Sequence, residues 1–441
     1  MKLKRGLAGL LTVIVFAVWP IQAVLAEETD EEAKLEAEKN ASLAAPIDTN
    51  SLEEWPEGPA VYAQSAIVMD MGSGAVLYAK KPDERHYPAS ITKLLTTLAA
   101  LENGTLTDRV TFSQESVDIL NWDDASIGMR PGEEISMEDA LYAVLLASAN
   151  EVSYAVAEST GRNHLNGGYD TFIELMNQRS AELGCTGSNW VNPHGLHDDN
   201  HYTTARDMAL IASAVYQREE FREIMNTLEY HIPATNLENE ERIFQQNHKM
   251  LWEGNDYYYE YCTGGKTGYT DQSMTTLVTM ADNGEMQLAA VLLYDYGVDA
   301  YTDTRAMLDY VFSNFSKVPV SDLDVPDAVE SFDDEEAYVV LPKGMDILEV
   351  ECMVSSENGT DGKAVYAYRG QTVGSADVTL KKGSIIKNMD TADSTADSEK
   401  GQSRGEEKGK RKSVIIICLS GISIAAVLLV ISFRRHRRTK K

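Results

Sequence analysis

The 441-residue chain has few cysteines, and this shortage excludes two classes of protein. It contains Cys185, Cys262, Cys352 and Cys418, and no two of them have the close spacing typical of a zinc site. Three widely spaced cysteines outside the apolar C-terminal run do not form a disulfide framework, although a Cys185–Cys262 bridge is possible. We interpret the cysteines as structural.

Positive charge is also scarce, with 39 Lys and Arg against 69 Asp and Glu and a formal net charge of −30. Three of the basic residues lie at the very start of the chain and six in its last eight residues, so the remainder is more acidic still. Such an exterior is soluble and repels polyanions. We therefore expect no nucleic-acid partner, but charge does not identify the substrate.

Long apolar runs are confined to the two ends of the chain. A basic start, an apolar run over 7–19 and small residues up to Ala26 predict a secretory signal peptide over 1–26. Residues 414–433 carry no charge and are numerous enough to span a bilayer as a helix, and the basic tail 434–441 favours a cytoplasmic C-terminus. We expect an extracytoplasmic protein held at the cell membrane by one C-terminal transmembrane helix.

Changes in composition divide the rest of the chain into four segments. The acidic, alanine-rich residues 27–58 predict a flexible stalk, and the polar residues 388–413 predict a disordered tether. Residues 317–387 contain short alternating runs that predict a small β-domain. Residues 59–316 predict the main domain.

Within the main domain, strand-like runs lie near both ends and helical runs between them. This order predicts an α/β (α+β) fold, in which one antiparallel sheet is assembled from distant parts of the chain, flanked by helices and beside a helical lobe. The predicted strands cover 65–70, 75–79, 274–280 and 286–294. The predicted helices cover 91–101, 136–145, 151–158, 171–183, 203–215 and 304–315. A loop-rich stretch is expected over 111–131, and Asn103-Gly104 suits a left-handed helix cap.

A serine and a lysine lie at the start of the first predicted helix, in Ser90-Ile91-Thr92-Lys93. Residues three apart share a helix face, so the Lys93 amine can reach the Ser90 hydroxyl. A serine hydroxyl is a poor nucleophile until a base takes its proton, and a desolvated lysine can be that base. Alone, this pair is a weak signal, because serines precede lysines by three in many surface helices.

Two later motifs strengthen the signal: Ser148-Ala149-Asn150 after a predicted helix, and Lys266-Thr267-Gly268 on a strand-like run. In this order the three motifs resemble the active-site triple of penicillin-binding proteins and serine β-lactamases. The stretches 192–196 and 201–209 narrow the resemblance to the D-alanyl-D-alanine carboxypeptidases of the low-molecular-mass penicillin-binding class, the S11 serine peptidases. The similarity covers residues 60–315.

The resemblance implies removal of the terminal D-alanine from peptidoglycan pentapeptide stems, and covalent inhibition by β-lactams. It implies that Ser90 is the nucleophile, that Lys93 is its general base, and that Ser148 relays protons to the leaving amine. Lys93 and the neighbouring Lys266 are expected to depress each other's pKa. No cofactor and no metal are expected.

The resemblance also implies the groups that bind substrate. Asn150 would hold the substrate amide, and Lys266 with Thr267 would receive its terminal carboxylate. Gly268 would let substrate lie against the strand, because it has no side chain. The backbone N–H groups of Ser90 and Tyr269 would stabilise the oxyanion, by about 3 kcal/mol each.

Several alternatives stay open. A β-lactamase commonly has a Glu-x-x-Leu-Asn loop between the second and third motifs, and no such string occurs here. Transpeptidation uses the same acyl-enzyme, and a non-catalytic muropeptide or β-lactam sensor would not need all three motifs. Some relatives have Gly where this chain has Ala149 and His where it has Tyr269, which puts substrate preference and deacylation rate in doubt. A metal site at His194, His197 and His201 is disfavoured, because the loop lacks a helical His-x-x-x-His scaffold.

Overall fold

The computed structural model describes residues 32–356 and 359–382. The predicted signal peptide, transmembrane helix and basic tail lie outside the described residues, as does the whole predicted tether. Within the described residues, we find no helix with the length and apolar character needed to cross a membrane.

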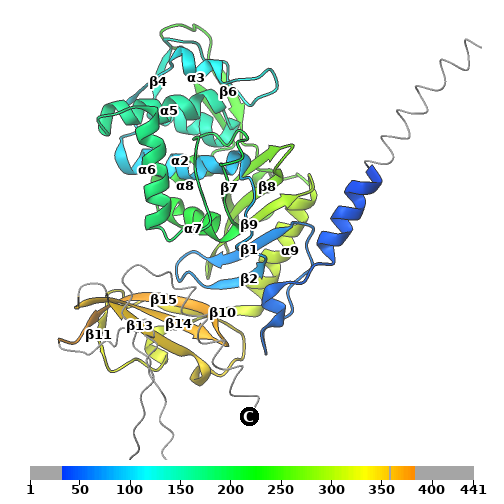
Figure 1. The fold of residues 1–441 in the computed structure, drawn as a ribbon, viewed down its shortest axis with the longest axis vertical. Coiled ribbons are helices and arrows are strands. Elements are labelled where there is room, and N and C mark those ends of the chain that lie inside the picture. The colour runs from blue at the N-terminus through cyan, green and yellow to red at the C-terminus, as the bar shows by residue number, and fades with distance from the viewer. Residues whose placement is uncertain (1–31, 357–358, 383–441) are drawn as a thin grey trace, which may run out of the picture.

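A five-stranded antiparallel sheet forms the centre of the main domain, with strand order β2-β1-β9-β8-β7 (Figure 1). Its strands are β1 (Ser65–Asp70), β2 (Val76–Lys80), β7 (Cys262–Thr270), β8 (Met274–Asp282) and β9 (Gln287–Asp295). Strand β1 therefore pairs with its neighbour in sequence, β2, on one side and with the distant β9 on the other, where Ile67 lies opposite Val291. The predicted antiparallel sheet built from distant segments is confirmed.

Both faces of this sheet are buried. Alternate residues of a strand point to opposite faces, and in β1 Ile67 and Met69 join the core of the helical lobe while Ala66 and Val68 join a second core. Helix α9 (Asp299–Asn314) and part of the small β-domain contribute to that second core. The strands therefore read as nearly continuous apolar runs, although antiparallel strands often have one polar face.

A helical lobe covers the other side of the sheet (Figure 1). It contains the 3₁₀ turn η2 (Ala89–Thr92) and the helices α2 (Lys93–Asn103), α3 (Gln114–Asp118), α4 (Met137–Tyr142), α5 (Asn150–His164), α6 (Tyr169–Glu182), α7 (Ala205–Tyr216) and α8 (Glu219–Met225). Two short hairpins complete it, made of β3 (Arg109–Thr111) with β4 (Glu134–Ser136), and of β5 (Glu229–Ile232) with β6 (Arg242–Gln245).

Side chains cap two helices of the lobe as their sequences predict. Ser136 Oγ accepts a hydrogen bond from Asp139 N at 3.0 Å at the start of α4. Thr204 Oγ1 accepts one from Asp207 N at 3.1 Å at the start of α7. Each bond satisfies one of the N–H groups that a helix terminus leaves without a partner.

Four local predictions differ from the structure. The loop expected over 111–131 contains α3, and α9 begins at Asp299 rather than at 304. The helix predicted over 136–145 changes at Ala143 into a π-helical turn that continues to Ala147. Gly104 has a φ of −133°, so it is extended rather than left-handed.

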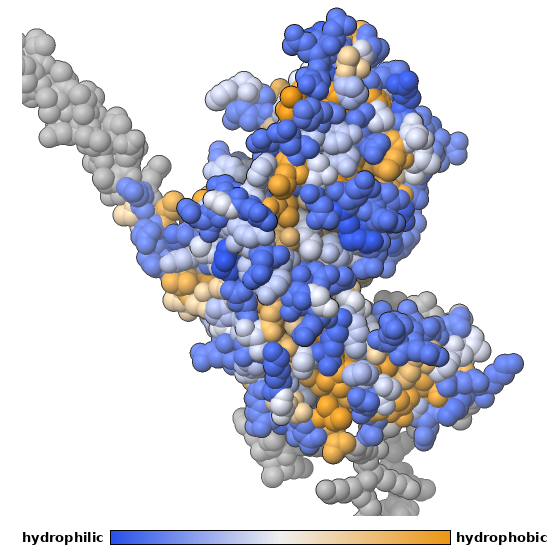
Figure 2. Space-filling view, turned by 180° about the vertical axis from the view of Figure 1, so that it is seen from behind, coloured by the Kyte–Doolittle hydropathy of each residue, from blue (hydrophilic) through white to orange (hydrophobic). Residues whose placement is uncertain are grey.

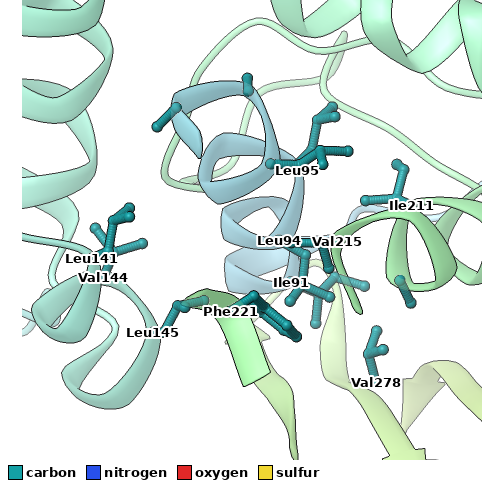
Figure 3. Close-up of a cluster of buried hydrophobic side chains, with 14 of the residues drawn as sticks. Ile91, Leu94, Leu95, Leu141, Val144, Leu145, Ile211, Val215, Phe221 and Val278 are labelled. Atoms are coloured by element: carbon teal, nitrogen blue, oxygen red, sulfur yellow. The ribbon is translucent and has the colours of Figure 1, made fainter. Parts of the chain in front are cut away.

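Helix α2 lies in the middle of the lobe core (Figure 3). Ile91, Leu94 and Leu95 are all fully buried, and Figure 3 shows them among side chains of the neighbouring elements. These neighbours are Leu141, Val144 and Leu145 before the second motif, Ile211 and Val215 on α7, Phe221 on α8 and Val278 on β8. Burial of each large aliphatic side chain contributes about 1.5–3 kcal/mol, so this packing fixes the helix that carries Ser90 and Lys93.

A small β-domain follows α9 (Figure 1). It consists of the pair β10 (Phe315–Pro319) and β12 (Tyr338–Pro342), and of a four-stranded sheet of order β11-β15-β14-β13. The sheet strands are β11 (Val329–Phe332), β13 (Glu351–Ser356), β14 (Asp361–Tyr368) and β15 (Gln371–Leu380). Figure 2 shows an apolar patch over this domain on an otherwise largely hydrophilic face.

The small β-domain is joined to the main domain by direct hydrogen bonds to the β1–β2 turn. Tyr338 Oη donates to Asp70 Oδ1 at 3.1 Å, and Ser375 N donates to Ser73 O at 2.9 Å. A Cβ on Gly72 would lie 2.2 Å from the Tyr338 hydroxyl oxygen, so only glycine allows this close approach.

The described part of the predicted stalk is packed on the main domain instead of being flexible. An exposed helix spans 32–43, and after it Ile47 and Trp55 are buried. Trp55 Nε1 donates to Leu77 O at 3.2 Å, and its ring lies 5.2 Å from that of Phe315. The low apolar content of this segment suggested a stalk, but two buried apolar side chains and specific hydrogen bonds hold it.

Candidate active site

Ser90 occupies a tight turn at the start of α2. The residue before it, Ala89, has a φ of 50°, which is uncommon for a residue with a side chain. Gly195 packs directly against this turn, since a Cβ on Gly195 would lie 1.9 Å from Ala89 O. Thr276 Oγ1 also donates to Pro88 O at 2.8 Å. The turn that presents the serine is therefore held from two sides.

Lys93 is fully buried, and its amine has three neighbours at hydrogen-bond distance. Its Nζ lies 2.9 Å from Ser90 Oγ, 2.8 Å from Asn150 Oδ1 and 2.5 Å from His194 O. The structure thus brings the first two motifs together, and it adds a backbone carbonyl that the sequence did not indicate.

This arrangement fixes how a neutral Lys93 amine is oriented. A neutral amine has two N–H groups and one lone pair. The Asn150 amide oxygen and the His194 carbonyl can only accept, so they take the two N–H groups. The lone pair then faces Ser90 Oγ, which is the geometry a general base needs.

The surroundings of Lys93 favour that neutral form. Burial lowers the pKa of Lys93 well below its usual value, and the neighbouring Lys266 cation lowers it further. The carboxylates of Glu151 and Asp124 act in the opposite direction. The net effect lowers the pKa of Lys93 and favours the neutral amine.

Ser148 is placed by strained backbone. It follows the π-helical turn over 143–147 and has a φ of 62°, the left-handed conformation that favours glycine. Single π-turns inside helices are frequent at functional sites. The Ser148 hydroxyl accepts a hydrogen bond from Lys266 Nζ at 3.0 Å, which joins the second motif to the third.

Lys266 is also buried, on the edge strand β7. Besides Ser148, its Nζ donates to Thr267 O at 2.8 Å. Burial lowers the pKa of Lys266 to about 7. The ammonium therefore exchanges its proton near neutral pH, and an anion bound beside it would stabilise the charged form.

The glycine at position 268 lets β7 approach Ser90. A Cβ on Gly268 would lie 2.9 Å from Ser90 N and 2.4 Å from Thr276 Oγ1. Side chains longer than hydrogen would therefore push the strand away from the serine.

The N–H of Tyr269 points to the free edge of β7. Gly265 N, which alternates to the same side as Tyr269, donates to Met225 Sδ, whereas Thr270 N donates to Ser273 Oγ in the β7–β8 turn. The N–H groups of alternate residues point to opposite sides of a strand, so that of Tyr269 faces away from β8. Its side chain is 61% exposed, and its hydroxyl donates to Asp271 Oδ1 at 3.3 Å.

The histidines of the loop after α6 position the site. His201 Nε2 lies 2.8 Å from Thr92 Oγ1, and its Nδ1 accepts from Val191 N at 3.1 Å. Burial lowers the pKa of His201 to about 3, and it lowers that of His194 well below its usual range. Both rings are therefore neutral at pH 7, and His194 contributes to the site through its carbonyl.

The structure also shows the state of the cysteines and the position of Tyr259. Cys185, Cys262 and Cys352 are free thiols in the described part of the chain. Tyr259 is a buried residue of the core, and its hydroxyl donates to Asp309 Oδ1 at 2.8 Å.

Sequence reasoning missed the backbone contributions to the site. The positive φ of Ala89 and of Ser148 has no signal in residue type, since neither is glycine or asparagine. The carbonyl of His194 could have been suspected only from the turn-forming Asn-Pro-His-Gly string. In that string Asn192 Oδ1 accepts from Gly195 N at 2.7 Å and shapes the turn.

The model of the family described as "Peptidase_S11: D-alanyl-D-alanine carboxypeptidase" matches residues 53–296. The D-alanyl-D-alanine carboxypeptidase DacF of Bacillus subtilis is 27% identical over 350 residues, which is 75% of this chain and 84% of that protein. The D-alanyl-D-alanine carboxypeptidase DacA of Haemophilus influenzae is 32% identical over 268 residues, 58% of this chain and 63% of that protein.

Solved structures share the fold. Penicillin-binding protein 5 from Haemophilus influenzae superposes with a TM-score of 0.58 at 25% identity, over 74% of this chain and 98% of that one. The Streptomyces K15 DD-transpeptidase gives a TM-score of 0.54 at 24% identity, over 58% of this chain and all of that one. The second likeness supports the fold alone.

Proposed function

Because the chain belongs to the D-alanyl-D-alanine carboxypeptidase family S11 and is a serine carboxypeptidase of that family, we propose that it removes the terminal D-alanine from peptidoglycan pentapeptide stems through an acyl-enzyme on Ser90. The observation that carries this proposal is the orientation of Lys93. Its two obligate acceptors, Asn150 Oδ1 and His194 O, leave the lone pair for the Ser90 hydroxyl.

In the acylation step, Ser90 Oγ attacks the carbonyl carbon of the penultimate D-alanine while Lys93 takes the hydroxyl proton. Negative charge develops on the carbonyl oxygen, and the N–H groups of Ser90 and Tyr269 stabilise it. The peptide C–N bond then breaks as Ser148 gives its hydroxyl proton to the leaving amine and receives the proton that Lys93 took from Ser90, so Lys93 is neutral again. Water completes the cycle by hydrolysing the ester, with Lys93 again acting as the base.

The third motif binds the substrate's free carboxylate. Lys266 has two donor contacts, to Ser148 Oγ and to Thr267 O, and its third N–H can be directed to that carboxylate, beside the Thr267 hydroxyl. Because Gly268 has no side chain, the peptide backbone can lie alongside β7. These contacts select a peptide with a free C-terminus, which defines a carboxypeptidase.

Inhibition by β-lactams follows from the same chemistry. A β-lactam carries a strained amide and a carboxylate, so it meets Ser90 and Lys266 as the D-Ala-D-Ala end does. Attack opens the ring, but the leaving nitrogen stays tethered to the acyl group. The adduct therefore persists.

We also propose that the enzyme acts outside the cytoplasm and is held to the membrane by residues 414–433. The proposal rests on the apolar runs at the two ends of the sequence. The full-length chain should sediment with membranes, and a chain ending at residue 382 should be released into the soluble fraction. Release of the full-length chain as well would contradict the anchor.

The deciding experiment uses a soluble chain covering residues 32–382 and its Ser90→Ala variant. Each is incubated with a peptide ending in D-Ala-D-Ala and, separately, with fluorescent penicillin. Free D-alanine and a slowly lost penicillin adduct, both absent in the variant, are expected. Rapid penicillin turnover would indicate a β-lactamase, and binding without covalent labelling a sensor. Transfer of the peptide to an added amine at the expense of the hydrolysed peptide, with D-alanine released in both cases, would indicate a transpeptidase.

A further inference from the structure

Glu151, the residue that directly follows the second motif, is a buried carboxylate to which the proposed mechanism assigns no step. Its side chain is completely buried at the start of α5. Its Oε1 accepts hydrogen bonds from Ser126 Oγ at 2.7 Å and from Ile127 N at 2.8 Å. Its Oε2 has no hydrogen-bond partner among the described residues.

A buried carboxylate with one unpartnered oxygen destabilises a fold unless positive charge lies nearby. The loop that Glu151 holds is otherwise exposed, and Trp122 at its tip is 96% exposed. Stability of the lobe therefore gives no reason for a charge at this position. The Glu151 charge acts instead on the Lys93 amine in the site.

The contacts of Glu151 connect it to Lys93 in two ways. Backbone and side-chain bonds fasten residues 124–127 to the start of α5, because Asn150 N also donates to Ala125 O at 2.8 Å. The same Asn150 accepts from Lys93 Nζ, so the loop and the lysine share one support. The Glu151 charge, like that of Asp124, also acts on the Lys93 amine directly.

We propose that Glu151 is a positioning residue for the acylation step: its carboxylate holds Ser126 and Ile127 at the start of α5, beside the Asn150 amide that orients Lys93, and its charge acts on that lysine. This inference rests on the proposed function, because it assigns Glu151 a part in the reaction of Ser90.

The charged and titratable groups around Lys93 are few. They are Glu151 on α5, Asp124 in the loop, Lys266 on β7, and His194 and His201 in the loop after α6. The two histidines stay neutral across the range where Lys93 works. Lys266 has a pKa of about 7, and its effect on carboxylate binding is removed by measuring acylation at saturating penicillin, while its effect on Lys93 is common to all variants.

The test is the pH dependence of penicillin acylation in Glu151→Gln. Glutamine keeps an oxygen to accept from Ser126 and Ile127 but carries no charge. The acid limb of the acylation rate should move to lower pH by about one unit, because Asp124 alone then opposes the effects of burial and of Lys266 on the pKa of Lys93. The maximal rate should fall about threefold, since a weaker base transfers the proton less well.

Three controls separate charge from structure. Ser126→Ala removes one bond to Glu151 and should leave the acid limb in place. Glu151→Asp keeps the charge and should hold the limb near its original pH, at a reduced rate because the loop is loosened. Glu133→Gln removes an equally buried carboxylate, which pairs with Arg242 at 2.8 Å, and should also leave the limb unmoved.

An unmoved acid limb in Glu151→Gln would overturn the inference and leave a purely structural carboxylate. If that variant does not fold, Glu151→Asp decides the question. An acid limb that moves down by a full pH unit although the charge is kept would show that the charge at this position does not control the basicity of Lys93. The proposed function fails differently, because the unchanged protein would then release no D-alanine from a D-Ala-D-Ala peptide.

Discussion

Two buried lysines on opposite sides of the central sheet have opposite tasks. Lys80 on β2 and Lys93 on α2 are both fully buried. Lys80 Nζ donates to the carbonyls of Ser42, Val61 and Ala63 at 2.7–2.8 Å, and it thereby ties the N-terminal segment to the sheet. Lys93 instead contacts a serine hydroxyl and two acceptors in the active site.

The charges nearby explain the difference. Burial lowers the pKa of both lysines. Around Lys80 the carboxylates of Asp303 and Asp295 oppose this effect, so its pKa is about 8 and it remains an ammonium at pH 7. Around Lys93 the Lys266 cation adds to the effect. Burial therefore makes a lysine reactive only where the surrounding charge does not restore its proton.

The largest effect is expected when Lys93, the proposed base, is replaced. Lys93→Met removes the base, so penicillin acylation should fall by at least about 10³-fold. Stability should fall by only about 1 kcal/mol, because a neutral amine leaves no charge behind. Fluorescent-penicillin labelling and urea unfolding measure the two quantities. Acylation at the original rate would exclude Lys93 as the base.

The same substitution at the structural lysine should have the reverse outcome. Lys80→Met leaves the Asp303 carboxylate buried without its cation and removes the Lys80 hydrogen bonds from three carbonyls, of which Ser42 O and Ala63 O keep another donor. The free energy of unfolding should fall by about 3 kcal/mol. Acylation per folded molecule should stay within twofold. A stable Lys80→Met protein would show that the N-terminal segment is held by packing alone.

A smaller effect concerns the pH dependence of substrate binding. Lys266 is protonated below its pKa of about 7, so its attraction for a carboxylate is complete at lower pH and declines as pH rises. The KM for a D-Ala-D-Ala peptide should rise about tenfold per pH unit above 7. A peptide whose C-terminus is an amide lacks the carboxylate and should show no such rise. Parallel pH profiles for the two peptides would contradict the role of Lys266.

The smallest effect refines the structural side of the comparison. Ser42 Oγ donates to Ala63 O at 3.1 Å, but the Ser42 carbonyl is the closer acceptor for Lys80. Ser42→Ala should therefore destabilise the fold by only about 0.5–1 kcal/mol, with unchanged acylation. Thermal unfolding measures the first and penicillin labelling the second. A loss of stability as large as that expected for Lys80→Met would show that the Ser42 hydroxyl, and not the Lys80 charge, makes the main contribution to holding this segment.

Much of the fold was predictable because the signals are local. Apolar periodicity located α2, α6, α7 and the strands of the central sheet, and the capping residues Ser136 and Thr204 marked two helix starts correctly. Local signals failed where a single long-range contact decides the conformation. The segment after residue 42 reads as polar and mobile, yet Lys80 and Trp55 hold it through contacts with distant residues.

The candidate site divides in the same way. The three motifs could be predicted from residue type and spacing, because their chemistry needs a hydroxyl, an amine and an amide in order. The left-handed backbone at Ala89 and Ser148 could not be predicted, since it is imposed by neighbours such as Gly195 and by the π-helical turn. Glu151 was passed over because one buried acid after a motif has no distinctive pattern.

The sequence by itself determined which chemical groups this protein has for acyl transfer: a serine and a lysine one helical turn apart, and a second lysine on a strand. Only the tertiary structure decided what each lysine does. The state of an amine depends on burial and on the charges within a few ångströms, and those charges come from segments far apart in the chain. That is why Lys80 holds the fold together while Lys93 faces Ser90, for which we propose it as the base.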